Sequence, residues 1–178
     1  MFDSLEEILK LPQDDAAEKG ELILLYGMVA ALKPHYVVET GTHKGVSALA
    51  MAAAMFDEDI DGVIHTADPR GWGAEQNAAK FPHLAQYIDF QRCRGDEMNV
   101  DGKIDLLFLD GLHERDEVLS EFEYLKPKMS EDCVVVFHDA GGDNAQVGVN
   151  EAVKKLGIPN VAINTHNSIR VGSYYNPM

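Results

Sequence analysis

The fold of this chain is decided by the stretch Tyr36-Val-Val-Glu-Thr-Gly-Thr-His-Lys-Gly45-Val-Ser47. An apolar run ends in an acid, two glycines follow, and an alanine-rich segment begins at Ser47. This order predicts a strand, a tight turn and a helix, which would place backbone N–H groups beside the tip of a parallel strand. Such a turn suits the polar edge of a nucleotide-like ligand. A purely structural turn with two glycines is the alternative.

Apolar segments that resemble strands alternate with helical segments along the rest of the chain. We expect strands at residues 36–39, 63–67, 87–92, 104–109 and 133–137. We expect helices at residues 4–11, 16–32, 47–56, 75–80, 116–125 and 149–156. In the second helix, the apolar stripe is expected to consist of Leu24, Leu25, Met28, Ala31 and Leu32. The alternation predicts an α/β fold with a doubly wound, Rossmann-like, mostly parallel sheet covered by helices on both faces.

Two further strands are expected at residues 161–164 and 169–175. Only residues 165–168 join them, which is too short for a parallel crossover, so they should form an antiparallel hairpin at one edge. A length of 178 residues suits one domain, residues 1–178, with the helices of residues 1–33 packed on the core.

The composition limits the class of partner and the compartment. Thirty acidic residues against 15 Lys and Arg give a formal charge of −15, which would repel nucleic acid and anionic membranes, although acids also simply maintain solubility. No apolar run approaches the ~20 residues of a membrane span, and the first residues do not resemble a signal peptide. Two cysteines without metal or redox spacing favour a cytoplasmic protein with reduced thiols.

One acid lies at or just after the tip of each of the first five expected strands. These residues are Glu39, Asp68, Asp96, Asp110 and Asp139. Ligands of open α/β sheets bind beyond the carboxyl ends of the strands, so these acids should converge on one crevice. Asp68 lies about 20 residues past the glycine turn, the spacing of an acid that binds ribose hydroxyls, although an Asp-Pro pair can simply start a loop.

The glycine pattern argues against a dinucleotide. Gly41 and Gly45 do not form the G-x-G-x-x-G turn that binds a pyrophosphate, so NAD is disfavoured. A ligand without phosphates that carries ribose, adenine and an amino-acid moiety fits the acidic rim better. In such a ligand, Asp96 would accept a hydrogen bond from the amine of the base.

Three motifs resemble those of class I S-adenosylmethionine-dependent methyltransferases. They are Val38-Glu-Thr-Gly-Thr-His-Lys-Gly-Val-Ser47, Ile104-Asp-Leu-Leu-Phe-Leu-Asp-Gly-Leu-His113 and Val134-Val-Val-Phe-His-Asp139. The chain is similar to the small O-methyltransferase group that includes the macrocin and catechol enzymes and cephalosporin hydroxylase-like proteins. The resemblance covers residues 21–175. It implies a seven-stranded sheet with an antiparallel last strand, and methyl transfer to a hydroxyl of a small molecule.

The resemblance also implies where S-adenosyl-L-methionine binds. Glu39, Gly41 and Gly45 would surround its methionine part, Asp68 its ribose, and Gly95 with Asp96 its adenine. The expected cofactor-binding set is completed by Thr42, Ser47 and Asp110.

Many members of this group bind a divalent metal at the tips of the fourth and fifth strands. The matching residues are Asp110, His138 and Asp139. Oxygen ligands suit Mg²⁺, whereas a histidine is better tolerated by Mn²⁺ or Fe²⁺. The alternative is that His138 and Asp139 only shape a loop. His113 is the candidate general base, because an imidazole titrates near neutral pH; an exposed residue at the start of a helix is the alternative.

The sequence departs from this group at two positions. Leu112 stands where relatives often carry an acid, and Ser130-Glu-Asp132 replaces a Pro-Gly-Gly turn. Leu112 favours a second hypothesis, a methyltransferase-like protein that binds nucleoside or metal without catalysis. A metal-dependent hydroxylase is disfavoured because the expected ligand set holds one histidine and two acids. A homodimer is expected, whose partner subunit would supply walls that this short chain lacks.

Overall fold

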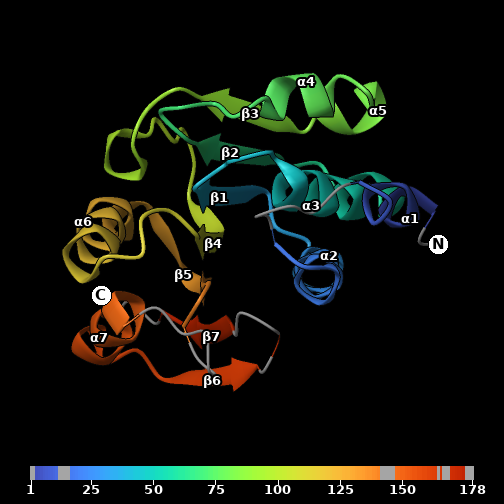
Figure 1. Cartoon of the computed structure of the whole chain (residues 1–178). Helices are drawn as coiled ribbons and strands as arrows, with labels where there is room; N and C mark the ends of the chain where they lie inside the picture. The colour runs from blue at the N-terminus through green and yellow to red at the C-terminus, as the bar shows by residue number, and fades with distance from the viewer. Residues whose placement is uncertain (1–2, 12–16, 141–146, 164, 166–168, 175–178) are drawn as a thin grey trace.

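Seven strands form one mixed sheet in the order β3-β2-β1-β4-β5-β7-β6 (Figure 1). The computed structural model describes residues 3–11, 17–140, 147–163, 165 and 169–174. The parallel strands are β1 (Tyr36–Thr40), β2 (Val63–Ala67), β3 (Ile88–Gln91), β4 (Ile104–Leu109) and β5 (Met129–Phe137). The order reverses beside β1, from which the chain proceeds first to β2 and β3 and then to β4 and β5. This is the switch point at which α/β proteins bind ligands.

The final hairpin is confirmed. Strand β7 (Ile169–Ser173) pairs antiparallel with both β5 and β6 (Asn160–Ile163), and β6 forms the edge. Asn164, residues 166–168 and Tyr175, which the sequence analysis placed in these strands or in their connection, lie outside the described residues. The replacement Ser130-Glu-Asp132 lies inside β5 and not in a turn, because β5 begins at Met129.

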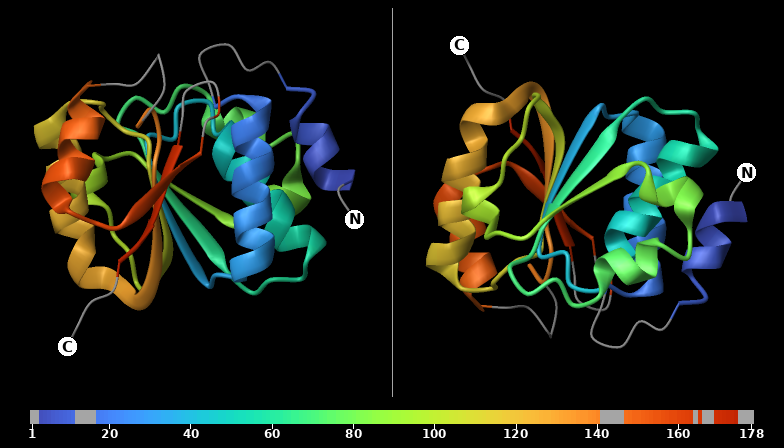
Figure 2. Two further views of the ribbon diagram at one scale, coloured as in Figure 1. Left: turned by 90° about the horizontal axis from the view of Figure 1, so that it is seen from below. Right: turned by 90° about the horizontal axis from the view of Figure 1, so that it is seen from above.

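Helices cover both faces of the sheet (Figure 2). One face carries α1 (Asp3–Ile8), α2 (Lys19–Leu32), α3 (Val46–Asp57), α4 (Ala74–Ala78) and α5 (Pro82–Ala85), and the other carries α6 (Arg115–Leu125) and α7 (Val147–Leu156). Each layer has its own hydrophobic cluster, which is typical of a doubly wound sheet. None of the helices in the described ranges combines the length and hydrophobicity needed to cross a lipid bilayer.

Helix α2 differs from the prediction at its start and in its buried face. The expected first residue, Ala16, lies outside the described residues, and the helix begins at Lys19. Its buried apolar residues are Leu22, Leu25, Tyr26 and Val29. Of the expected stripe, Leu25 is fully buried and Leu24 and Met28 pack partly buried against the core, whereas Ala31 and Leu32 are exposed. Nearly every residue of this helix is apolar, so the sequence alone did not single out one face.

The start of α2 is fixed by Glu18 and Glu21. The side chain of Glu21 accepts a hydrogen bond from the backbone N–H of Glu18 at 2.8 Å, which closes a capping box. Glu21 itself is completely buried. A buried carboxylate at the beginning of a helix needs further partners, and these lie at the functional site.

Candidate functional site

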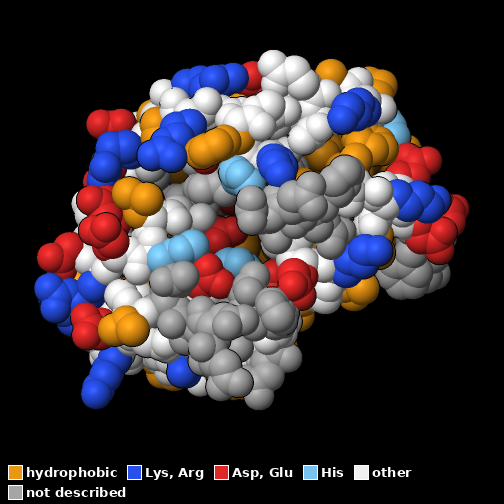
Figure 3. All heavy atoms as spheres, in the orientation of Figure 1, with side chains coloured by type: hydrophobic (Ala, Val, Ile, Leu, Met, Phe, Trp, Pro, Cys, Tyr) orange, Lys and Arg blue, Asp and Glu red, His pale blue; other side chains and the backbone are white. Residues whose placement is uncertain are grey.

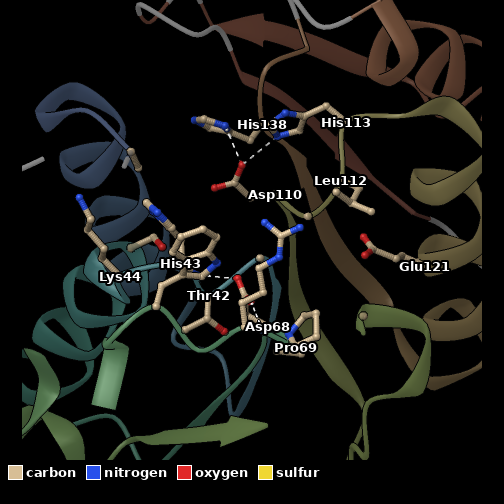
Figure 4. A pocket seen from close by; sticks show the side chains of 18 of the residues that line it. Thr42, His43, Lys44, Asp68, Pro69, Asp110, Leu112, His113, Glu121 and His138 are labelled. Carbon is tan, nitrogen blue, oxygen red and sulfur yellow. Dashed lines mark hydrogen bonds and ion pairs between the residues drawn. The ribbon is translucent and has the colours of Figure 1, made fainter. Parts of the chain in front are cut away.

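A cavity of about 780 Å³ opens beyond the carboxyl ends of the parallel strands (Figure 4). Strand register brings its parts together: Leu109 pairs with both Thr40 and Phe137, so Gly41, Asp110 and His138 follow neighbouring strand ends. Most of the expected site residues line the cavity: Gly41, Thr42, Ser47, Asp68, Gly95, Asp110, His113, His138 and Asp139. Glu39, Gly45 and Asp96 do not line it. The volume lies within the range of about 300–1,000 Å³ typical of small-molecule sites.

Gly41 is required by the geometry of the turn. Its φ is +85°, and a Cβ atom at this position would lie 1.9 Å from the carbonyl oxygen of Asp110. No side chain fits at that distance, so glycine allows the β1 and β4 ends to approach each other. Gly45, with φ +74°, precedes α3 and shapes the turn from behind the cavity wall.

Asp68 lies on the cavity wall after β2. Its Oδ2 accepts a hydrogen bond from the backbone N–H of His43 at 3.1 Å, and its Oδ1 accepts one from the N–H of Arg70 at 2.7 Å. Asp68 thus shapes its own loop and ties it to the glycine turn. Its carboxylate also remains on the cavity wall, where a ribose hydroxyl would find an acceptor.

Glu39 lies beneath the cavity, so the expectation that it surrounds the ligand directly is corrected. The side chain is fully buried, and its two oxygens accept hydrogen bonds from Ser47 and Thr66, each at 2.5 Å. Burial raises the pKa of Glu39 to about 8, although both hydroxyl donors act to lower it. Glu39 therefore supports the floor of the site through Ser47, which does line the cavity.

Thr42 and Thr66 extend this hydrogen-bonded floor. The Oγ1 atoms of the two threonines lie 2.6 Å apart, and Thr66 also donates to Glu39. Thr42 lines the cavity, so the network connects the buried carboxylate with the ligand-facing surface.

Asp96 also departs from its expected role. Its Oδ1 accepts from Nε of Arg94 at 3.1 Å and its Oδ2 accepts from the hydroxyl of Ser120 at 2.8 Å. Both oxygens are thus turned toward side chains of the protein. Its neighbours Arg94 and Gly95 line the cavity instead. Gly95 thus lies on the cavity wall and Asp96 does not, and their roles toward the adenine stay predictions.

Two histidines and two aspartates form a cluster at the opposite side of the cavity (Figure 4). Nδ1 of His138 lies 2.8 Å from Oδ1 of Asp110, and Nε2 of His113 lies 3.3 Å from Oδ2 of Asp139. One donor atom from each of these four residues lies within 4.8 Å of the other three. His113, expected as the general base, lies in this cluster beside the expected ligands Asp110, His138 and Asp139. The argument against a hydroxylase, which rested on a single histidine, no longer holds.

The charges within the cluster are strongly coupled. Burial acts to raise the pKa of Asp110, but the adjacent imidazolium charges of His138 and His113 lower it overall. For His138, burial acts to lower the pKa, whereas the carboxylates of Asp110, Asp139 and Glu21 raise it to about 12. The contact with Asp110 raises the pKa of His113 above its ordinary value. The cluster therefore stabilises positive charge.

Asp139 adopts a backbone conformation that non-glycine residues rarely use, with φ +52°. It lies two residues after the end of β5, and this conformation turns the chain away from the strand while its side chain, only 12% exposed, faces His113 and His138. Such uncommon conformations gather at functional sites, where the surrounding structure maintains them. Residues 141–146 lie outside the described residues.

Sequence reasoning missed two buried acids at this site. Glu21 contacts Nε2 of His138 at 3.1 Å, and Glu121 on α6 accepts a hydrogen bond from the hydroxyl of Thr40 at 2.8 Å. Glu121 lines the cavity, and burial raises its pKa to about 7. One signal was available, because Glu121 occupies a core-facing position between Val118 and Leu125 in the helical repeat. An acid on an apolar face indicates a buried partner or a ligand.

The mouth of the cavity carries the single tryptophan of the chain. Trp72 is 49% exposed, its ring meets the ring of His43 edge-on at 5.2 Å, and Arg70 lies over it at 5.5 Å. Figure 3 shows acidic and histidine side chains gathered in the hollow at the middle of this face. The cavity thus has an aromatic and basic rim and an acidic interior.

Solved methyltransferase structures share this fold. An O-methyltransferase from Streptomyces achromogenes, described as a complex with S-adenosylmethionine, superposes with a TM-score of 0.76 at 17% identity, over 98% of this chain and 90% of that one. An O-methyltransferase from Bacillus cereus, described as a complex with S-adenosylhomocysteine, gives a TM-score of 0.72 at 14% identity, over 96% and 90% of the two chains. The predicted seven-stranded methyltransferase architecture is confirmed.

A sequence relative and a family model complete the comparison. An uncharacterized protein of Sinorhizobium fredii is 31% identical over 127 residues, which are 63% of this chain but only 14% of that protein. The chain therefore spans about one-seventh of the relative's length. The model of the methyltransferase domain matches residues 38–140, from the β1 strand through the whole His–Asp cluster. On this match, together with the strand order and the glycine turn, the chain belongs to the methyltransferase domain family.

Proposed function

We propose that this protein transfers a methyl group from S-adenosyl-L-methionine to a hydroxyl of a small molecule, with the help of a divalent metal ion. One observation carries the proposal: a single cavity joins the glycine turn and Asp68 on one side to the Asp110–His138–Asp139 cluster on the other. The first side suits a nucleoside, and the second suits a metal and the hydroxyl that the metal would activate.

Three residues on the nucleoside side of the cavity suit the cofactor. Gly41 has no side chain, because a Cβ there would clash with the backbone of Asp110, so its own backbone lines the cavity. Asp68 would offer a carboxylate to the ribose. Gly95 lies opposite, where a Cβ would come within 2.6 Å of both the methyl group of Thr40 and the carboxylate of Glu121. Both glycines line the cavity, so a bound cofactor would meet protein backbone and not a side chain at these two positions.

The residues also fit a metal. In the described ranges, the buried nitrogens Nε2 of His113 and Nδ1 of His138 have no hydrogen-bond partner, and both face aspartate oxygens. When bound, the sulfonium cofactor supplies the methyl group, and a divalent ion lowers the pKa of the acceptor hydroxyl and orients its oxygen. The C–O bond would form as the C–S bond breaks, and the hydroxyl proton would pass to a base of the protein. His113 is close enough to serve as that base or as a further metal ligand, but a ligated nitrogen cannot accept the proton.

Calorimetric titration with S-adenosylhomocysteine tests the nucleoside side. We expect wild-type protein to bind it and Asp68→Ala to bind at least about 10-fold more weakly, because a charged hydrogen bond is worth about 1.5–3 kcal/mol. Exposed Asp132 provides the control variant Asp132→Ala, which should bind as wild type does. No binding by wild-type protein at millimolar ligand would overturn the proposal.

Methyl transfer itself requires a second assay. Labelled S-adenosylmethionine should methylate members of a panel of phenols, catechols and sugars when a divalent metal is present. The second candidate function, ligand binding without catalysis, rests on Leu112, which is 55% exposed on the cavity wall. Tight cofactor binding with no transfer to any acceptor would support that alternative. The cytoplasmic location, the small-molecule acceptor and the homodimer remain predictions from the sequence.

A further inference from the structure

We infer that Asp110, His113, His138 and Asp139 together form a four-donor centre for a transition metal such as Mn²⁺, Fe²⁺, Co²⁺ or Zn²⁺ and not for Mg²⁺. His113 is then a ligand of the metal and not the general base. This inference rests on the metal in the proposed function, which it deepens by naming the metal class and the complete ligand set.

The spacing of the donor atoms fits a single ion. Nε2 of His113 lies 3.5 Å from Oδ1 of Asp110 and 3.3 Å from Oδ2 of Asp139. Nδ1 of His138 lies 2.8 Å from the first of these oxygens and 3.6 Å from the second. Ligands about 2.0–2.2 Å from one ion lie roughly 3–4 Å from each other, so these four atoms need only small shifts to surround it.

The two histidine nitrogens point to a ligand because, within the described part of the chain, their charge contacts with the aspartates are not accompanied by hydrogen bonds. Both atoms are buried and, among the described residues, form no hydrogen bond of acceptable geometry despite the nearby carboxylates. A buried polar atom in a folded protein nearly always has a hydrogen-bond partner, so each exception calls for an explanation such as a bound ion. Two such nitrogens facing the same pair of oxygens form the arrangement that a cation would complete.

Glu21 fixes the ring orientation of His138. Its Oε2 lies 3.1 Å from Nε2 of His138, and its Oε1 accepts a hydrogen bond from the hydroxyl of Thr165 at 2.8 Å. With a metal ion on Nδ1, the hydrogen of a neutral His138 would sit on Nε2 and be donated to Glu21. A carboxylate behind a ligating histidine is the usual outer partner of a metal site.

The composition of the set selects the class of metal. Mg²⁺ prefers oxygen ligands and retains several waters, whereas two imidazoles and two carboxylates suit first-row transition metals. His113 contributes half of this nitrogen character and comes from the segment between β4 and α6, where Arg115 begins the helix. Nε2 of His113 lies within ligand spacing of both aspartates, as Nδ1 of His138 does.

Metal titration of the full chain, first stripped with EDTA, tests the inference directly. Calorimetry should show Mn²⁺ and Co²⁺ binding at one site and at least about 10-fold more tightly than Mg²⁺, in line with the affinity order for nitrogen-containing sites. The visible spectrum of the Co²⁺-loaded wild type should show the absorption bands of imidazole coordination. This second measurement needs no variant.

Three histidine variants separate the ligands from the surroundings. His113→Ala and His138→Ala should each weaken Mn²⁺ binding by at least about 10-fold, since losing even an outer partner costs 10–100-fold. His35, exposed at the opposite end of β1, provides the control His35→Ala, which should bind as wild type does. Circular dichroism establishes that each variant is folded.

Two results would overturn the inference: Mg²⁺ binding as tightly as Mn²⁺, or His113→Ala keeping full Mn²⁺ affinity and the Co²⁺ spectrum. Neither result would affect binding of S-adenosylhomocysteine. Failure of the metal centre is therefore distinguishable from failure of the proposed methyltransferase function.

Discussion

Oε2 of Glu21 lies 3.1 Å from Nε2 of His138, although 117 residues separate the two along the chain. Glu21 is completely buried and belongs to the first turn of α2, and His138 directly follows β5. Glu21→Gln removes the charge but keeps the size of the side chain. We expect Mn²⁺ affinity to fall about 10–100-fold, because the amide orients the imidazole less strongly.

Isothermal titration with Mn²⁺ measures this loss, with exposed Glu123→Gln on α6 as the matched control. Binding of S-adenosylhomocysteine should change little in either variant. A Glu21→Gln protein that binds Mn²⁺ as wild type does would show that Glu21 only caps the helix.

The raised pKa of Glu39 predicts a pH-dependent stability. Its ordinary value is 4.5, and burial raises the pKa to about 8 in the folded protein. Between these values the folded state binds more protons than the unfolded state, so this residue's contribution to stability is complete below pH 4.5 and is lost as the pH rises toward 8. Glu121, whose pKa is raised to about 7, acts with the same sign.

Urea unfolding at pH 5, 6.5 and 8 measures this effect. Glu39→Gln carries no titrating group, so its stability relative to wild type should increase by on the order of 1 kcal/mol or more from pH 5 to 8. The exposed Glu131→Gln should show a constant difference from wild type over the same range. A constant difference for Glu39→Gln as well would mean that Glu39 is ionised in the folded protein.

Gly41→Ala should destabilise the protein and damage the cavity. A Cβ would lie 1.9 Å from the carbonyl oxygen of Asp110, and the φ of +85° disfavours any side chain. We expect a loss of at least about 2 kcal/mol in thermal or urea unfolding, because both backbone strain and a clash act together.

Gly27 provides the matched control for this substitution. It lies inside α2 with no atom within 4 Å of an added Cβ. Gly27→Ala should therefore stabilise the protein by about 0.5–1 kcal/mol. Equal effects of the two substitutions would contradict the tight approach of β1 and β4.

Trp72 provides a built-in probe of ligand binding. It is the single tryptophan of the chain and lies at the mouth of the cavity, half exposed. Titration with S-adenosylhomocysteine should change the tryptophan emission in a saturable way, because a ligand there excludes water from the ring. Trp72→Phe should abolish the signal while calorimetry still detects binding. Saturable calorimetric binding with unchanged emission would place the ligand away from Trp72.

The sequence predicts the sheet well because each strand has a simple signal. Residues 63–67 and 104–109 are strands with the expected bounds, and the short connection before β7 forces the antiparallel hairpin. The short helix α5, Pro82–Ala85, was missed because four residues carry no periodicity.

The candidate site was predicted only in part, because order along the chain does not determine where a side chain points. Glu39 is the penultimate residue of β1 and Asp96 lies in the turn after β3, but hydroxyl and guanidinium donors of the protein engage both side chains. Glu21 could not be linked to His138 from the sequence, because their contact depends on how α2 packs on the sheet.

The contacts of Glu21 also determine when the site can form. Glu21 bonds to His138 and to Thr165, which lies 144 residues further along the chain. Such distant pairings form slowly, because the entropy of closing a long loop is lost before the contact can stabilise the fold. Residues 38–140 contain all four donor atoms of the cluster but neither Glu21 nor Thr165. A fragment trimmed to those limits would thus keep every ligand and lose the scaffold behind His138, which makes the centre a property of the assembled chain and not of a transplantable module.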